Sequence, residues 1–549
     1  MSLQNQPVAD VPQQTERIAR AAFPKGNLYL QMSDQLGILY ENAPFAELFP
    51  RTGQPGIAAW RLALITVWQF AENLTDRQAA EAVRARIDWK YALRLEMEDT
   101  GFHYSVLSEF RDRLIAGNQE TLLLYEMLAR FNDLGLLKTR GKQRTDSTHI
   151  LAAIRNVNQL ELVHETLRYA LNELAQQAPA WLKRRVTGEW LELYGERTSN
   201  YLLPKKESEC QAWGERVGRD GWFLLEKILL KDEYPELGEL QAVETLRRVW
   251  VQNFSLESDR IRLRKRNNQP PSSLPIASPY DMEARVSSKR FITWTGNKIH
   301  MTETCNTESP SFITNVETRP STETDHAATA LIHQHLEQNS RLPAEHFVDA
   351  GYMSVDHLVR ARDDHGIDLL GRVPQDTSWQ ARQAGYVVQD FTVDWEQQVV
   401  TCPQRRISCS WTPAFARGGY PVVKVRFRGK DCQVCPTLTR CSNNREKRRT
   451  LTLMAPQSQF EAQQTARQRQ NTPEFKEACR VRAGVEGTIS QAAIALRARR
   501  SRYRGQAKTH LQHLRTAAAI NLLRALAWIN RVPRSVTRQS HFALLAAGL

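Results

Sequence analysis

The sequence lacks any apolar run long enough to cross a membrane. The two best candidates, residues 57–70 and 516–529, are shorter than the roughly 20 residues that a spanning helix needs, and Arg61 and Arg524 interrupt them. The opening residues, MSLQNQPVADVPQQ, also lack the basic segment followed by an apolar one that marks a secretory signal. We therefore expect a cytoplasmic protein with no membrane partner.

Acidic residues are in deficit, and internal repeats are absent. The chain has 60 Asp and Glu against 74 Lys and Arg, a net charge of +14. Such a surplus suits a polyanion such as DNA, although many basic proteins have no such partner. At 549 residues, 41% of them hydrophobic, the chain has enough apolar material for two or more domains.

Cysteine is sparse, with eight residues in the whole chain. In the cytoplasm these thiols stay reduced, so a cluster of them is first considered as a set of metal ligands. Cys402, the pair Cys432 and Cys435, and Cys441 form a candidate structural zinc site, with Cys409 as a competing ligand. The alternative is a set of reduced, partly buried thiols.

The first quarter of the chain has a helical pattern. We expect a disordered tail over 1–15 and a helical DNA-binding domain over 16–137, in which Thr75 and Gln78 form a capping box. The expected helices are 57–70, 75–86, 104–114 and 121–134. Basic residues on these helices are compatible with a helix-turn-helix-like module, or with a plain bundle that has a solvated charged face. They are Arg84, Arg86, Lys90, Arg94, Arg111 and Arg113.

The rest of the chain alternates strands and helices, which predicts an α/β core with parallel strands. A first strand lies within 138–155. Gly296-Asn297 predicts a hairpin turn between strands 291–294 and 298–302. The other expected elements are helices at 158–253, a polar joint at 267–279, a helix at 324–338, strands at 346–350 and 366–373 around a helix from Ser354, a β-rich segment at 385–455, and helices at 473–500 and 509–529.

Three carboxylates stand out by their surroundings. Asp146 lies on the first strand, and Asp349 ends a short apolar strand, where functional groups gather in α/β sheets. Glu486 lies within a helical segment, four residues after Arg482, so the two share a helix face and the arginine can steady the carboxylate or reach a phosphate. Such acids suit Mg²⁺, and two ions about 3.5–4 Å apart can activate an attacking oxygen and stabilise a leaving one.

Two glycines flank Glu486. Gly484 and Gly487 each cost a helix about 1 kcal/mol relative to alanine. We expect that the helix backbone there approaches a strand or DNA closely.

Five segments carry a resemblance to a known family. They are TDSTH (145–149), YDMEARVSSKRFITWTGNKIHMTETC (280–305), FVDAGYMS (347–354), RAGVEGTISQ (482–491) and RRSRYRGQAKTHLQH (499–513). In this order they resemble the DDE transposases of bacterial insertion sequences, most of all the group called eleven-eighty-two. The resemblance implies a ribonuclease-H-like fold, with Asp146, Asp349 and Glu486 as catalytic residues and ligands of two Mg²⁺ ions, for which Mn²⁺ can substitute.

Long separations in the chain imply insertions in that fold. Asp349 follows Asp146 by 203 residues, and Glu486 follows Asp349 by 137. We expect a catalytic domain over 138–530 with a helical insertion (158–279) and a β-rich insertion that carries the cysteines (385–455), then a tail (531–549). Related transposases often have Tyr and Lys where this chain has Cys479 and Ala493.

A dense basic stretch follows the segment that carries Glu486. Arginine forks there can grip phosphates and a tyrosine can stack, whereas the alternative is a solvated face. With Arg482, the expected DNA-binding residues are Arg497, Arg499, Arg500, Arg502, Tyr503, Arg504 and Lys508.

The sequence thus predicts a transposase that binds the inverted ends of its element, cuts there and joins them to target DNA. Bringing two ends together favours a homodimer, and DNA binding would place the protein on the nucleoid. The alternatives are a domesticated descendant that binds DNA without catalysis and a nuclease of related fold that cuts without joining.

Overall fold

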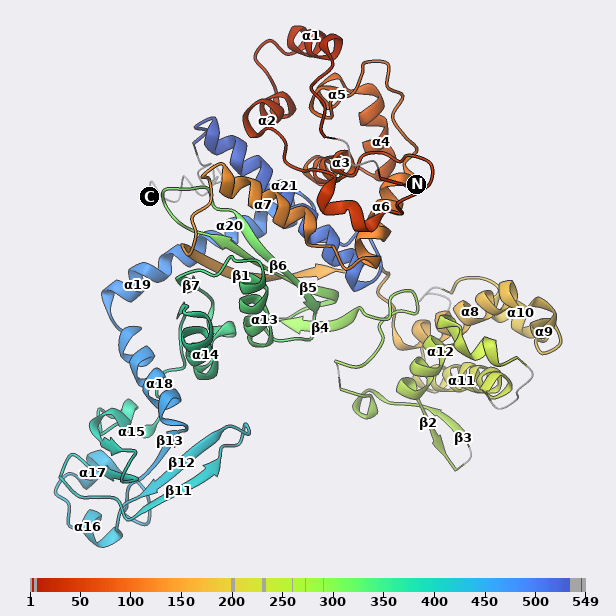
Figure 1. The fold of residues 1–549 in the computed structure, drawn as a ribbon. Helices are drawn as coiled ribbons and strands as arrows, with labels where there is room; N and C mark the ends of the chain where they lie inside the picture. Colours follow the sequence, from red (N-terminus) through yellow and green to blue (C-terminus); the bar gives the residue numbers. More distant parts are fainter. Residues whose placement is uncertain are drawn as a thin grey trace.

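The computed structural model describes residues 2–533 except 4–6, 199–202, 230–233, 259, 272 and 290, together with Leu545. Most of the expected C-terminal tail therefore lies outside the described residues. A central sheet and the N-terminal helices form one body, from which a helical lobe and a β-rich lobe project (Figure 1). No helix within the described ranges is long and apolar enough to span a bilayer.

The N-terminal region is helical, as predicted. Helix α4 begins at the capping box of Thr75 and Gln78, and α3 is almost wholly buried because it is apolar on every side. The expected tail differs, since α1 already begins at Gln13 and the buried Ser2 donates a 2.8 Å hydrogen bond to the Gly53 carbonyl. The elements are α1 (Gln13–Ala22), α2 (Leu28–Leu36), η1 (Ala43–Leu48), α3 (Ala59–Ala71), α4 (Asp76–Ala85), α5 (Ile87–Ala92), α6 (Ser105–Ala116) and α7 (Leu122–Asp133).

The central sheet is mixed, with the order β4-β5-β1-β7-β8, and β6 also pairs with β5. Strand β1 is antiparallel to β5 and parallel to β7, which is in turn parallel to β8. Of the six strands, β1, β7 and β8 are parallel to one another, as predicted, whereas the pairings of β4, β5 and β6 are antiparallel. The strands are β1 (Lys142–Leu151), β4 (Arg285–Lys289), β5 (Ile292–Thr304), β6 (Ile313–Pro320), β7 (Glu345–Phe347) and β8 (Asp368–Leu370).

The predicted hairpin turn at Gly296-Asn297 is wrong. Both residues lie inside the long strand β5, and the β4–β5 hairpin turns between Lys289 and Ile292. Gly296 has φ +150°, and a Cβ there would lie 2.1 Å from the Ile150 carbonyl oxygen. The glycine allows β1 and β5 to approach closely. From the sequence alone, a glycine with this role cannot be told from a glycine in a turn.

Helices cover both faces of the sheet. Helices α13 (Asp325–Gln338) and α14 (Val355–His365) lie on one face, and β7 followed by η5 (Ala350–Tyr352) connects them (Figure 1). On the other face lie the short helix α20 (Gly484–Ser490) and the long helix α21 (Gln506–Ile529). The predicted 473–500 helix is broken into α19 (Pro473–Arg480), a 3₁₀ turn η7 (Val481–Ala483), α20 and the π turn η8 (Gln491–Ala495).

Helix α21 joins the N-terminal helices to the sheet. It packs against β6, α3 and α7, and one continuous hydrophobic core holds Trp68 of α3, Met301 of β5 and Ala518 of α21. The N-terminal helices therefore share their core with the sheet.

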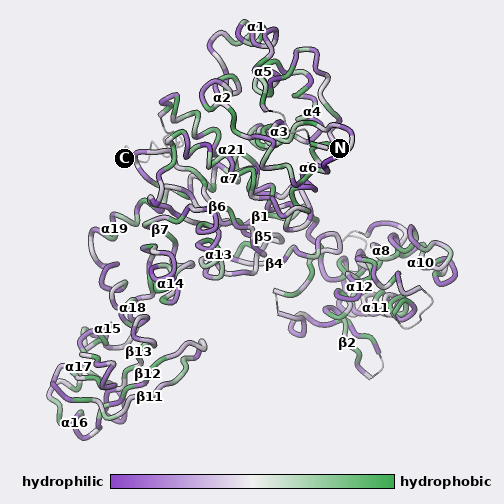
Figure 2. Tube along the Cα trace, in the orientation of Figure 1, coloured by the Kyte–Doolittle hydropathy of each residue, from purple (hydrophilic) through white to green (hydrophobic). Residues whose placement is uncertain are grey.

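The two lobes each have a core of their own, and apolar and polar stretches alternate along the chain in both (Figure 2). The helical lobe, between β1 and β4, has α8 (Gln159–Gln177), α9 (Pro179–Lys183), α10 (Gly188–Tyr194), α11 (Glu207–Leu229), α12 (Gln241–Asn253) and the hairpin β2 (Phe254–Glu257) and β3 (Arg260–Leu263). The β-rich lobe follows β8, with α15 (Trp379–Arg382), β9 (Thr392–Asp394), β10 (Val399–Thr401), β11 (Ser410–Phe415), β12 (Pro421–Arg426), α16 (Gly429–Gln433), α17 (Leu438–Cys441) and β13 (Thr450–Met454), and α18 (Gln457–Arg469) leads back to the sheet.

Candidate active site

Asp146 lies on β1, and Asp349 lies two residues after the end of the neighbouring parallel strand β7, on the same face of the sheet. Arg144 of β1 pairs with Phe347 of β7, and each acid follows its member of that pair by two residues. Asp349 keeps an extended backbone (φ −76°, ψ 163°), so the two-residue alternation of side chains continues to it. The negative charge of Asp349 is close enough to raise the pKa of Asp146.

The Asp146 carboxylate is partly desolvated and held at both oxygens. Burial is the main reason that its pKa is raised, and two donors oppose this effect. The Ser147 N–H lies 2.7 Å from Oδ1, and Nη1 of Arg482 lies 2.9 Å from Oδ2. The carboxylate is therefore fixed in direction.

Glu486 lies over the same face, joined to Asp146 through one guanidinium. Nη2 of Arg482 is 3.3 Å from Oε1 of Glu486, which confirms the predicted i,i+4 contact, although Arg482 lies in the η7 turn and Glu486 in α20. The Glu486 side chain is 65% exposed. The structure thus brings all three acids to one region, while no group of three or more His, Cys, Asp or Glu side chains in the described ranges is arranged to hold a metal ion.

A buried ionic network fixes α20 against the sheet. Glu303 of β5 is fully buried, and its carboxylate lies 2.6 Å from Nη2 of Arg144 and 2.7 Å from Nη1 of Arg524 on α21. Thr488 of α20 donates to the same carboxylate at 2.5 Å. Sequence reasoning missed these positioning residues. No local signal marks them, because β5 (ITWTGNKIHMTET) mixes polar and apolar residues, and only the burial of Glu303 shows that it needs cations nearby.

Only one of the two glycines beside Glu486 has the predicted close neighbour. A Cβ on Gly484 would lie 2.0 Å from Nη1 of Arg144, so α20 approaches β1 through this glycine. That guanidinium also donates to the Val481 carbonyl at 2.5 Å. A Cβ on Gly487 would meet nothing within 4 Å, so its face of the helix is open.

A second polar layer lies on the opposite face of β1. Ser147 donates to Asp325 at 3.0 Å, and Lys298 forms an ion pair with the same acid at 3.3 Å. His300 hydrogen-bonds the Tyr352 hydroxyl at 2.7 Å. Burial lowers the pKa of His300 to about 4 and raises that of Tyr352 well above its usual value. Both side chains are therefore neutral near pH 7, and their hydrogen bond joins β5 to η5 on the face of the sheet opposite the three acids.

Several of the predicted DNA-binding side chains make contacts inside the protein. Arg499 donates to the Thr148 hydroxyl at 2.7 Å, and Arg502 donates to the Leu74 carbonyl at 2.6 Å and lies over the Phe70 ring. The other two engaged residues are Tyr503, which accepts from Arg111 at 2.8 Å, and Lys508, which pairs with Asp112 at 2.9 Å.

The remaining three arginines of the basic stretch are exposed: Arg497, Arg500 and Arg504. Of the six N-terminal basic residues, Arg111 is buried against Asp76 and Arg86 pairs with Glu72 and Asp88. Much of the positive charge in these segments is therefore used in contacts within the protein, whereas the guanidinium groups of these three arginines remain exposed.

Two positions at which this chain differs from the expected motif are accommodated by packing. Ala493 is buried in the η8 turn, where a lysine would lose its solvation. Cys479 packs against the small core of Phe347 and Phe475, and burial raises the pKa of its thiol.

Comparison with known families gives two matches. Residues 401–526 match a family described as "Transposase DDE domain", and residues 17–113 match one described as "Transposase domain (DUF772)". The first match includes Glu486 and the basic stretch, and the second covers α1 to α6 in large part. No curated protein and no solved structure matched the chain.

Proposed function

We propose that the chain is a DDE transposase of an insertion sequence, because both matched regions are transposase domains. In this proposal it binds the terminal inverted repeats of such an element, cleaves there and transfers the freed strands into target DNA. Membership of the eleven-eighty-two group is part of the proposal and rests on the five sequence motifs. We further propose that two protomers act together, because two ends must be brought together.

We propose a ribonuclease-H-like core for this activity. The support is the sheet itself, in which antiparallel β6, β5 and β1 continue into parallel β7 and β8 with helices between the parallel strands. The helical lobe is inserted between β1 and β4, and the β-rich lobe between β8 and α19. With both insertions in place, β1 and β7, the strands that lead to Asp146 and Asp349, still pair with each other.

The single observation that carries the proposal is the convergence of Asp146, Asp349 and Glu486 on one face of the sheet. Carboxylate oxygens are the hard donors that Mg²⁺ prefers, and Asp349 and Glu486 are exposed. The donor chemistry of these residues therefore suits the ions, which when bound would supply charge stabilisation at the attacking and leaving oxygens, and the three acids must draw closer together to hold them. Arg482 holds Asp146 and Glu486 in place and offers positive charge to a phosphate.

The exposed arginines fit the role of phosphate contacts. Arg500 and Arg497 follow directly after α20 and η8, and Arg504 lies over the Tyr280 ring with its guanidinium 5.1 Å from the ring centre. We propose that these three hold the DNA backbone beside the acids.

The test is Mg²⁺-dependent cleavage of a labelled DNA that carries the element's end. Asp146→Asn, Asp349→Asn and Glu486→Gln each remove one carboxylate charge, and we expect each to lose cutting and strand transfer while keeping binding in a mobility-shift assay. Glu477→Gln is the matched control, since Glu477 is exposed one helix earlier, and should cut normally. Wild-type cleavage by any of the three variants would refute the assignment, and cutting without strand transfer would indicate a nuclease.

A further inference from the structure

The core of the β-rich lobe is too small to explain how two of its three short helices, α16 and α17, are held in place. Its core consists of seven buried residues, all from the strands and their ends: Phe391, Val400, Val423, Val425, Phe427, Leu451 and Leu453. Every residue of α16 and α17 is described, and none is buried. Small modules of this kind usually need a disulfide or a metal ion in addition to apolar packing.

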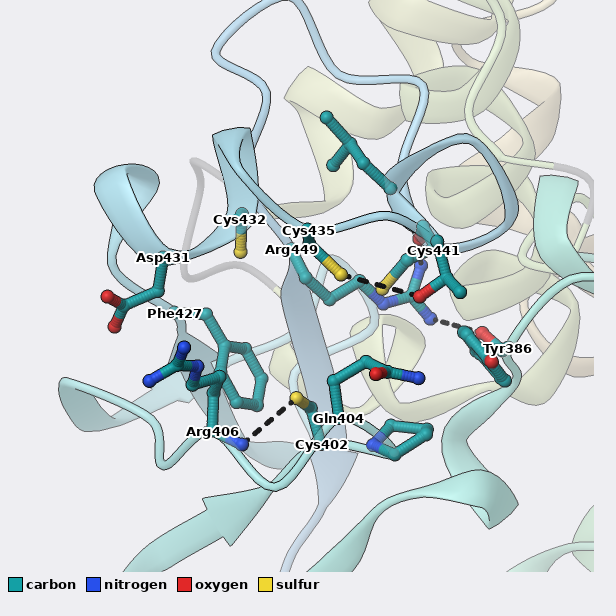
Figure 3. A pocket seen from close by; sticks show the side chains of 13 residues that line it. Tyr386, Cys402, Gln404, Arg406, Phe427, Asp431, Cys432, Cys435, Cys441 and Arg449 are labelled. Atoms are coloured by element: carbon teal, nitrogen blue, oxygen red, sulfur yellow. Dashed lines mark hydrogen bonds between the residues drawn. The ribbon is translucent and has the colours of Figure 1, made fainter.

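Four cysteines meet where those helices join the strands. Cys402 follows β10, Cys432 lies in α16, Cys435 comes just after α16, and Cys441 ends α17. All four line one pocket of about 30 Å³ (Figure 3), enough for one small ion, because a water-sized site needs about 10–15 Å³. Cys409 is exposed and does not line this pocket.

The backbone around the thiols has the tight turns that a metal site uses. The Cys435 N–H bonds the Cys432 carbonyl at 3.1 Å, so the C-x-x-C segment folds back on itself. The Arg406 N–H points at the Cys402 sulfur at 3.4 Å, a contact that stabilises a thiolate more than a thiol.

A buried cation that forms no ion pair with a carboxylate of the described residues, although the charge of Asp376 is near, completes the site. Arg449 lines the same pocket and is only 6% exposed. Its guanidinium donates to the backbone carbonyls of Cys441 at 2.9 Å and Tyr386 at 3.1 Å, and its Nε has no hydrogen-bond partner in the described ranges. A buried positive charge of this kind requires a negative neighbour.

We propose that Cys402, Cys432, Cys435 and Cys441 bind one structural Zn²⁺ as four thiolates, with Arg449 offsetting part of the resulting charge. Zinc with four thiolates carries a net charge of −2, and its binding releases the four thiol protons to solvent. The four thiols line the pocket but are not arranged as metal ligands in the described ranges, so the sulfurs must draw in to about 2.3 Å from the ion. The metal would then fasten α16 and α17 to the strands, a structural role separate from the carboxylate site.

Metal analysis of the full-length protein, purified without chelator, tests the proposal. We expect one zinc per chain, with four sulfur ligands by X-ray absorption, and Co²⁺ exchange should give the visible spectrum of a tetrahedral thiolate site. Cys432→Ser and Cys441→Ser should each lose the metal, while Cys409→Ser should keep it. A protein free of zinc that also fails to bind Co²⁺, or equal loss in Cys409→Ser, would overturn the proposal.

Two further measurements do not depend on whether the cysteine variants fold. Chelator added to wild-type protein should expose residues 385–455 to protease and leave the N-terminal helices protected; an unchanged digestion pattern counts against the zinc. Arg449→Gln should weaken Co²⁺ binding by about 10–100-fold, the usual effect of losing a residue that supports the ligands. Unchanged affinity would remove Arg449 from the site.

Discussion

Nη1 of Arg482 lies 2.9 Å from Oδ2 of Asp146, across 336 residues of sequence. The same guanidinium reaches Glu486, so the strand acid and the helix acid are aligned through one planar group. The alignment depends on how firmly α20 is held to the sheet.

The two glycines beside Glu486 should respond oppositely to alanine. In Gly484→Ala the new Cβ would overlap the Arg144 guanidinium, displace α20 and reduce both stability and DNA cleavage. Gly487→Ala meets open space and should stabilise the helix by up to about 1 kcal/mol. Thermal unfolding and cleavage rates measure both effects. Equal losses in the two variants would contradict the contact with Arg144, whereas lost cleavage with gained stability in Gly487→Ala would indicate that DNA approaches this open face.

Replacing two arginines of α21 with methionine should change the stability of the protein in opposite directions. Arg515 is fully buried and its guanidinium nitrogens have no hydrogen-bond partner in the described ranges; burial lowers its pKa to about 10. Arg515→Met should therefore stabilise the protein, by about 1–4 kcal/mol. Arg524→Met removes a partner of the buried Glu303 and should cost about 3–5 kcal/mol. Denaturant unfolding of the two variants decides, and destabilisation by Arg515→Met would show that this charge has a partner.

Within the basic stretch, replacing an exposed arginine should affect DNA binding more than replacing an arginine that is bonded inside the protein. Arg500 is exposed, so Arg500→Gln should weaken binding and reduce the slope of log K against log salt by about 0.9 for one lost phosphate contact. Arg502 is bonded to the α3–α4 loop, so Arg502→Gln should lower the melting temperature and leave that slope unchanged. Fluorescence anisotropy at several salt concentrations provides the measurement. A reversed pattern would place the DNA on the other side of this segment.

The ion pair of His335 and Glu317, 2.6 Å apart, should make stability depend on pH. The hydrogen bond to Glu317 raises the pKa of His335 despite partial burial and the charge of Arg319. Burial alone would raise the pKa of Glu317, but the bond from His335 holds it below its usual value. The histidine's contribution is complete below its ordinary pKa of about 6.5 and is lost as the pH rises through the raised value.

The stability difference between wild type and His335→Gln should accordingly be larger at pH 6 than at pH 9. Melting curves across this range give the difference, and the exposed His103→Gln serves as the control with no such trend. A difference that stays constant with pH would mean that the pair is not ionic.

Local signals in the sequence predicted most elements and the region of the acids. The capping box at Thr75 and the apolar strand before Asp349 depend on neighbours in the chain, and both are confirmed. Gly296 looks like a turn glycine in the sequence, because the strand residue that requires it, Ile150, lies 146 residues earlier in the chain. The network around Glu303 joins β1, β5, α20 and α21, and no local pattern contains that pairing.

The core that α21 shares with α3, α7 and the sheet has a mechanical consequence. A DNA end bound by the N-terminal helices would lie at a fixed distance from Asp146, because these helices and the sheet share one core. The protein itself would then set the number of base pairs between the recognised sequence and the cleaved bond. If one base pair is inserted between them, binding should stay at the recognised sequence and cleavage should shift by one base pair.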